Sequence, residues 1–419
     1  MREMKDSGIE WVGKVPATWK IMPNKYIMTK KKVIKEVYDG ENIISLSMNG
    51  VIIRDLEAGG KMPKTFDGYQ IVYPGNLLMC LFDYDVTPRC IGLIKDYGVT
   101  SPAYSQFVMN NGNYSGYYYY YYLMIDHTKA LLHLAKNLRH SLTEEQLGAI
   151  LAPVPTIEEQ QRIVDFLDSK CSEIDATAED IQKEISLLEE YKKSLVYNVI
   201  SNGINHSIYS TESDEVWGNL PQGWKLVDIK YLFEIVKRIA GKEGYDVLSV
   251  TQKGLKIKDI TSGDGQLADN YCGYQFVYPT DYVMNHMDLL TGWVDCSELF
   301  GVTSPDYRVF RLIDKSAHNL VYYKYVMQCC YMNKIFYSLG QGVSNLGRWR
   351  LQTSSFNNFK IPVPPKDEQD EIADYLDTKC SEIDSLIADK KRQLDILADY
   401  KKSLIYEYVT GKKEVPVNE

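Results

Sequence analysis

The hexapeptide Lys-Cys-Ser-Glu-Ile-Asp occurs twice in this chain, at residues 170–175 and again at 379–384, which is 209 residues later. Each copy lies inside a longer repeat that opens with Pro-Val-Pro, continues with Glu-Gln and closes on Tyr-Lys-Lys-Ser-Leu. The two repeats, 153–201 and 362–410, are identical at 23 of 49 positions. Agreement of this extent indicates an internal duplication, so we expect one structural unit to occur twice.

Apolar residues recur in each repeat in alternating steps of three and four, the pattern of a helix that buries a narrow seam against another helix. Polar residues interrupt the pattern at Lys192, Lys390 and Lys401, where they either fix the register of pairing or reach solvent. The predicted seam comprises Leu167, Cys171, Ile174, Ile181, Ile185 and Leu188 in the first repeat, and Leu376, Cys380, Ile383, Ile387, Leu394 and Leu397 in the second.

Neither repeat contains glycine or proline within 158–201 or 367–410. The Pro-Val-Pro entry cannot lie inside a helix, so it marks where each helix begins. At 1.5 Å per residue each helix is about 65 Å long, and we interpret both as spacers. The second helix is expected to return along the first as an antiparallel intramolecular coiled coil.

A globular half precedes each helix, and the two halves share short islands of sequence. Gly98 to Pro102 and Gly301 to Pro305 both read Gly-Val-Thr-Ser-Pro, and Val-Tyr-Pro occurs at 72–74 and 277–279. Between such islands the halves diverge, which suggests one framework with two different surfaces. The predicted domains are 1–152, a helix at 153–203, a second domain at 204–361, a second helix at 362–413 and a tail at 414–419.

Short runs bounded by Gly, Pro and Asp read as strands in both halves. They are 42–46, 70–73, 77–82 and 106–109 in the first half, and 246–250, 275–278 and 307–311 in the second. A helix is expected near 319–339. The run 117–137 is long enough for a helix, although its six consecutive tyrosines could also begin as a strand. Each half is therefore predicted to be mixed α/β, within an α+β chain.

The net charge of −9 is concentrated in the helices, since 153–203 holds 11 acids and 5 bases and 362–413 holds 12 acids and 9 bases. The globular halves are close to neutral and contain basic clusters, which leaves nucleic acid open as a partner. No apolar run is long enough to cross a membrane, and no signal peptide is recognisable, so a cytoplasmic location is expected. The eight cysteines and six histidines lack the spacing of a metal site or a disulfide framework.

Two divergent domains, each followed by a near-identical helix that opens with Pro-x-Pro and Glu-Gln, form a recognisable pattern. Together with Ile9-Glu10-Trp11 and Trp19 near the start, it resembles the DNA-specificity subunit of Type I restriction-modification systems. The resemblance implies two target recognition domains that read the two parts of a split double-stranded DNA site. It also implies that the helices dock two methyltransferase subunits, and that restriction and translocase subunits join the full complex. S-adenosylmethionine, ATP and Mg would then belong to the partner subunits, with no cofactor in this chain.

Sequence readout requires donors at base edges and cations at phosphates. The predicted DNA-binding residues are Lys30, Lys31, Lys32, Lys61, Lys64, Arg89 and Arg139 in the first half, and Lys237, Arg238, Lys256, Arg348 and Arg350 in the second. Each could instead belong to a solvated surface, and Arg89 could pair with Asp83 or Asp85.

No phosphate-binding loop, zinc-protease motif, nucleophile elbow or amino-methyltransferase tetrapeptide is present, so no catalytic residue is predicted. We therefore predict a non-catalytic subunit that recognises bipartite DNA and assembles modifying subunits. The alternative is a coiled-coil scaffold for protein partners without DNA specificity.

Overall fold

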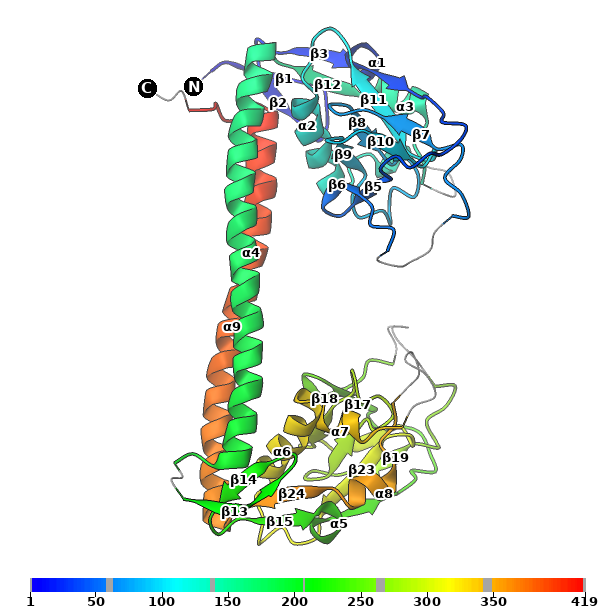
Figure 1. Ribbon diagram of the computed structural model, residues 1–419. Coiled ribbons are helices and arrows are strands. Elements are labelled where there is room, and N and C mark those ends of the chain that lie inside the picture. The colour runs from blue at the N-terminus through cyan, green and yellow to red at the C-terminus, as the bar shows by residue number, and fades with distance from the viewer. Residues whose placement is uncertain are drawn as a thin grey trace. The chain divides into compact units, whose positions relative to one another are not determined.

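In the computed structural model, described for residues 2–57, 63–135, 140–205, 208–260, 268–341 and 349–416, each sequence repeat forms one long helix. The helices are α4 (Ile157–Asn202) and α9 (Lys366–Val409) (Figure 1). The chain divides into two compact units, one of residues 1–181 with 392–419 and the other of 182–391. Each unit thus contains one globular half and a segment of both helices.

The first half is built around a four-stranded antiparallel sheet in the order β4-β11-β8-β9. Two-stranded antiparallel pairs, β1-β2, β3-β12, β5-β6 and β7-β10, complete it. Its elements are β1 (Met4–Asp6), β2 (Lys14–Pro16), β3 (Lys20–Pro23), α1 (Asn24–Ile27), β4 (Met28–Lys31), β5 (Ile44–Ser47), β6 (Gly50–Ile53), β7 (Gln70–Val72), β8 (Leu77–Met79), β9 (Ile91–Leu93), β10 (Gly98–Thr100), β11 (Ser105–Met109), α2 (Ser115–Thr128), η1 (Leu132–Leu134), α3 (Glu144–Ala149) and β12 (Leu151–Val154).

The second half repeats this plan around a sheet in the order β16-β23-β20-β21, with pairs β13-β14, β15-β24, β17-β18 and β19-β22. Its elements are β13 (Tyr209–Asp214), β14 (Gly218–Pro221), β15 (Lys225–Asp228), α5 (Ile229–Leu232), β16 (Phe233–Val236), β17 (Leu248–Thr251), β18 (Gly254–Ile257), β19 (Gln275–Val277), β20 (Tyr282–Met284), β21 (Val294–Cys296), β22 (Gly301–Thr303), β23 (Arg308–Leu312), α6 (Leu320–Met332), α7 (Ile335–Ser338), α8 (Thr353–Asn357) and β24 (Lys360–Val363). The predicted α+β class, with two strand-rich halves and two paired helices, is confirmed.

The tyrosine run of the first half is helical, which decides between helix and strand. Helix α2 ends at Thr128, earlier than the predicted run, because Lys129 adopts a left-handed backbone with φ of 50°. Tyr117, Tyr118 and Tyr121 are fully buried in the core. The helix predicted at 319–339 is also interrupted, since Lys334, with φ of 56°, separates α6 from α7.

The Glu-Gln pair of each repeat attaches the helix to its own half. The indole Nε1 of Trp19 donates to Glu159 at 2.8 Å, and Trp224 donates to Glu368 at 2.9 Å. Buried Gln160 donates to the Pro155 carbonyl at 3.1 Å and accepts from the backbone N–H of Tyr114 at 2.8 Å. Because polar groups taken out of water must be hydrogen-bonded, these shared motifs fix the start of each helix.

Within each unit the helix segments run antiparallel. In the first unit Lys401 binds Asp175 at 2.6 Å; in the second, Lys192 binds Asp384 at 2.7 Å. A further ion pair joins Lys390 to Glu184. The lysines that interrupt the apolar pattern therefore face acids on the opposite helix.

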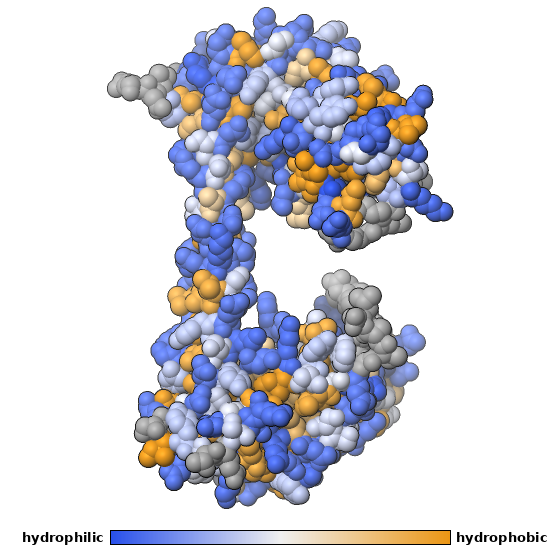
Figure 2. All heavy atoms as spheres, viewed as in Figure 1, coloured by the Kyte–Doolittle hydropathy of each residue, from blue (hydrophilic) through white to orange (hydrophobic). Residues whose placement is uncertain are grey.

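Most residues of the predicted seam are buried between the helices or against the adjoining half. Figure 2 shows hydrophilic residues over most of the visible helix surface, with hydrophobic ones interspersed. The buried seam residues are Leu167, Cys171, Ile174, Ile185, Leu376, Cys380, Ile383 and Ile387. Four others, Ile181, Leu188, Leu394 and Leu397, are half-buried.

Candidate nucleic-acid interface

Two of the lysines predicted to bind DNA in the first half, Lys30 and Lys31, lie on its edge strand β4. Lys30 forms an ion pair with Glu144, and the Lys31 ammonium lies 3.8 Å from the ring centre of Tyr73. Lys32 and Lys64 are exposed and have no hydrogen bond or ion pair with any described residue. Lys32 and Lys64 are therefore the lysines of this half that are most available to bind a phosphate.

Arg89 supports the hairpin β5-β6. Its guanidinium donates to the carbonyls of Met48 at 3.0 Å and Ile91 at 3.1 Å, and to the Tyr119 hydroxyl at 2.5 Å. These contacts, rather than an ion pair with Asp83 or Asp85, hold the side chain. Arg89 therefore fixes the hairpin turn to the sheet and to α2.

In the second half, Lys237 and Lys256 are exposed. Arg238 forms an ion pair with buried Asp281 and lies over the Tyr278 ring, 4.6 Å from its centre. Arg350 is exposed and contacts the sulfur of Met287, with Nε at 2.8 Å. Three predicted residues, Lys61, Arg139 and Arg348, lie outside the described residues.

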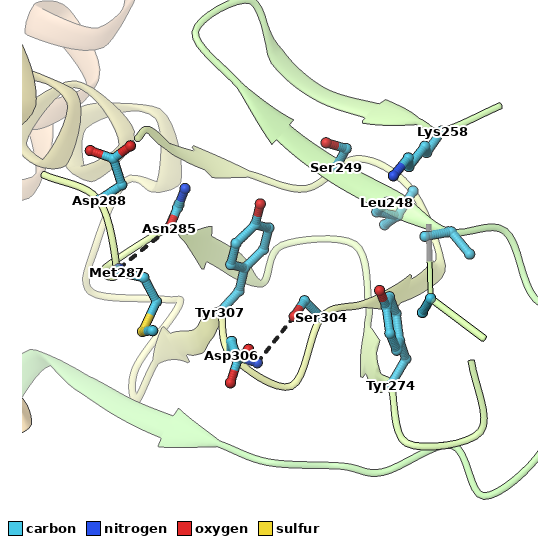
Figure 3. A pocket seen from close by; sticks show the side chains of 12 residues that line it. Leu248, Ser249, Lys258, Tyr274, Asn285, Met287, Asp288, Ser304, Asp306 and Tyr307 are labelled. Atoms are coloured by element: carbon cyan, nitrogen blue, oxygen red, sulfur yellow. Dashed lines mark hydrogen bonds between the residues drawn. The ribbon is translucent and has the colours of Figure 1, made fainter. Parts of the chain in front are cut away.

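A polar hollow of about 570 Å³ opens in the second half beside the hairpin β17-β18. Figure 3 shows the Tyr307 ring in its centre, with Ser249 on strand β17, Lys258 just after strand β18 and Asn285 just after strand β20. The Ser304 hydroxyl accepts a hydrogen bond from the backbone of Asp306 at 3.2 Å, which fixes the turn before Tyr307. The remaining lining residues are Val247, Leu248, Ala268, Tyr274, Met287 and Asp288.

Two basic residues that were not among the predicted DNA contacts, Arg308 and His286, are next in sequence to the lining residues Tyr307 and Asn285. Arg308 is buried, donates to the Leu351 carbonyl at 3.1 Å and packs 4.5 Å from the Phe356 ring centre. Burial lowers the pKa of Arg308 to about 10 and that of His286 to about 4, the latter helped by Arg308 and Arg350. At neutral pH His286 is therefore uncharged and Arg308 remains a cation.

A motif shared by the two halves marks part of the hollow in the sequence. The shared Gly-Val-Thr-Ser-Pro island is followed in both halves by one differing residue and then tyrosine, at Tyr104 and Tyr307. Within the described part of the chain, no group of three or more His, Cys, Asp or Glu residues could hold a metal ion. None of the helices there is both long enough and apolar enough to span a membrane.

Residues 221–395, most of the second half and part of α9, match the family model of the Type I restriction modification DNA specificity domain. This part of the chain is therefore similar to that domain family. The chain is 25% identical over 287 residues to the Type I restriction enzyme MjaVIII specificity subunit of Methanocaldococcus jannaschii. That match covers 64% of this chain and 63% of the relative, so the chain spans less than two thirds of that protein's length.

A second curated protein of the same organism is also 25% identical, over 296 residues, covering 66% of this chain and 62% of its own length. The fold is similar to that of a solved structure described as the structural basis underlying complex assembly and conformational transition of the type I R-M system. The TM-score is 0.68 at 14% identity, covering 95% of this chain and 99% of the other.

Proposed function

We propose that this chain is the non-catalytic specificity subunit of a Type I restriction-modification complex. Each globular half would bind one part of a bipartite site on double-stranded DNA, and the two helices would hold two methyltransferase subunits. Restriction and translocase subunits would join the full complex. The observation that carries the proposal is the duplication of one framework with two divergent surfaces, in a chain whose residues 221–395 match the specificity-domain family.

The proposed chemistry divides between subunits. The chain's own residues would supply cations for phosphates and polar groups for base edges, whereas S-adenosylmethionine, ATP and Mg would be bound by the partners. We also propose that the complex works in the cytoplasm, where DNA and these cofactors meet. The predicted residues Lys32, Lys64, Lys237 and Lys256 are proposed phosphate contacts because they are exposed.

The test is to assemble the full chain with its methyltransferase subunits and to map which sites in a genomic DNA become methylated. A split motif with a fixed non-specific spacer is expected. Binding of the same complex should weaken steeply with salt. Assembly without sequence-selective binding or methylation would instead identify a coiled-coil scaffold.

A further inference from the structure

The framework that surrounds the hollow in the second half recurs in the first half. Lys258 follows strand β18 and donates its backbone N–H to the Val247 carbonyl at 2.7 Å; Arg54 follows β6 and donates to Ile43 at 2.7 Å. A cation thus occupies the equivalent position in both halves. Serines also correspond, with Ser249 and Ser304 matching Ser45 and Ser101, and so do tyrosines, with Tyr274 and Tyr307 matching Tyr69 and Tyr104.

Buried glutamines hold the framework in place. Gln275 donates to the carbonyls of Ser304 at 2.9 Å and Tyr307 at 2.8 Å, and Gln70 makes the same two bonds to Ser101 and Tyr104. A buried amide that satisfies two carbonyls of one turn fixes that turn. The turn that carries the central tyrosine is therefore held from behind, independently of the residues that face the solvent.

Three residues that line the hollow differ from their counterparts in the first half. Asn285 stands where the first half has Cys80, and Asp306 where it has Ala103. Met287 corresponds to Phe82, whose ring stacks on Tyr104 at 6.2 Å and 22°. The two halves therefore share the residues that hold the turn and differ in residues that can contact a ligand. Two domains that distinguish different ligands of one chemical class need this arrangement.

The exchanged residues of the second half offer the groups that base edges require. The Asn285 carbonyl oxygen accepts from the backbone of Met287 at 3.3 Å, while its amide nitrogen has no hydrogen-bond partner among the described residues. This nitrogen can donate to a purine N7 or to a carbonyl oxygen of a base. Exposed Asp306 can accept from the amino group of cytosine or adenine.

We propose that this hollow is the base-reading site of the second half, with Asn285 and Asp306 setting base preference and Lys258 contacting the phosphate backbone. The inference rests on the proposed function, because it names the residues by which one half reads its part of the DNA. The first half reads different bases because the same framework there has Phe82 and exposed Ala103 in place of Met287 and Asp306, and buried Cys80 in place of Asn285. Arg54 takes the place of Lys258 at the phosphate.

The experiment selects DNA from a library randomised over both parts of the site, with the full chain assembled with its methyltransferase subunits. Asn285→Ala and Asp306→Asn are each expected to reduce preference at a position of the second part by about tenfold, the size of one base contact. The first part should stay unchanged. Glu298→Gln is the matched control, since it neutralises an exposed acid of the same half outside the hollow and should leave both parts unchanged.

Lys258→Met tests the phosphate contact separately. Its binding should weaken by a similar factor for all sequences, and the dependence of log affinity on log salt should become shallower by about one unit. Met287→Phe, which mimics the first half, should change the selected bases while the apolar character of the position is kept. If these variants all select the wild-type sequence with wild-type affinity and salt dependence, the assignment of the hollow is wrong.

The proposed function of the chain and the base-reading role of the hollow can be refuted separately. A wild-type complex that selects no sequence at all would refute the proposed function. A wild-type complex that selects a split site, with hollow variants that melt like wild type and select the same site, would refute only the base-reading role. A change confined to the first part of the site would also refute it.

Discussion

Replacing Ile185 by alanine should destabilise the second unit, and replacing Leu187 should not. Both residues lie on α4 two positions apart, but Ile185 is 1% exposed in the helix seam and Leu187 is 64% exposed. Truncation of a buried isoleucine to alanine costs about 2–5 kcal/mol, because transfer free energy is lost and a cavity remains. Loss of an exposed leucine side chain is expected to cost at most about 0.5 kcal/mol.

The difference can be measured by thermal unfolding followed by circular dichroism. For a unit of this size each kcal/mol lowers Tm by about 2–4 °C, so Ile185→Ala should melt about 5–15 °C lower than Leu187→Ala. Ile185→Asp should cost more than Ile185→Ala, since it places an unpaired carboxylate in the seam. Equal melting of the alanine variants would refute the role of Ile185 in pairing the helices, and so would an aspartate variant with wild-type stability.

Three further predictions concern modularity, helix length and pH. Exchanging residues 1–152 for those of another family member should change one part of the DNA site, as seen by methylation mapping, and a change in both parts would contradict independent reading. Adding one heptad after Ile181 and one after Lys390 keeps the apolar pattern and lengthens each helix by about 10 Å. The non-specific spacer of the DNA site should then become longer by about three base pairs. An unchanged spacer in a variant that still binds DNA would show that helix length does not set the spacer. Burial lowers the pKa of half-buried His286 to about 4 from 6.5, so the unfolded chain binds a proton at a higher pH than the folded chain does, and the free energy of unfolding should decrease as pH falls from 6.5 to 4. The variant His286→Gln should lose less stability over that interval in urea titrations, and a loss identical to that of the wild type would contradict the assigned cause.

The helices and the framework could be predicted from sequence because duplication made their constraints visible. A three-four apolar period, an uninterrupted run without glycine or proline and a repeated Pro-Val-Pro entry together define a long paired helix. The ends of α2 and α6 were harder to predict from the sequence. Lys129 and Lys334 adopt the left-handed backbone conformation there, which is usual for glycine or asparagine and is not indicated by a lysine in the sequence.

The candidate interface was harder to predict because a basic residue alone does not show its partner. Arg89 and Arg238 are cations of the kind that contacts phosphates. In this structure, however, Arg89 holds a hairpin turn and Arg238 forms an ion pair with buried Asp281. The hollow around Tyr307 was missed because it is polar and nearly neutral, and it is assembled from segments far apart in the sequence. Two motifs shared by the halves, Thr-Ser-Pro-x-Tyr and Gly-Tyr-Gln, contain residues of the hollow and are visible in the sequence.

The lysine–aspartate pairs of the helices have an evolutionary consequence. Lys192 and Lys401 are equivalent positions of the repeat, as are Asp175 and Asp384, so each helix carries both the donor and the acceptor of the pairing. A helix that contains both partners is complementary to an antiparallel copy of itself. A gene encoding a single half with its helix could therefore have produced a symmetric homodimer that bound a palindromic split site. After tandem fusion of two such genes, each copy could change independently. The two parts of the recognised DNA site would then no longer need to be related by a palindrome.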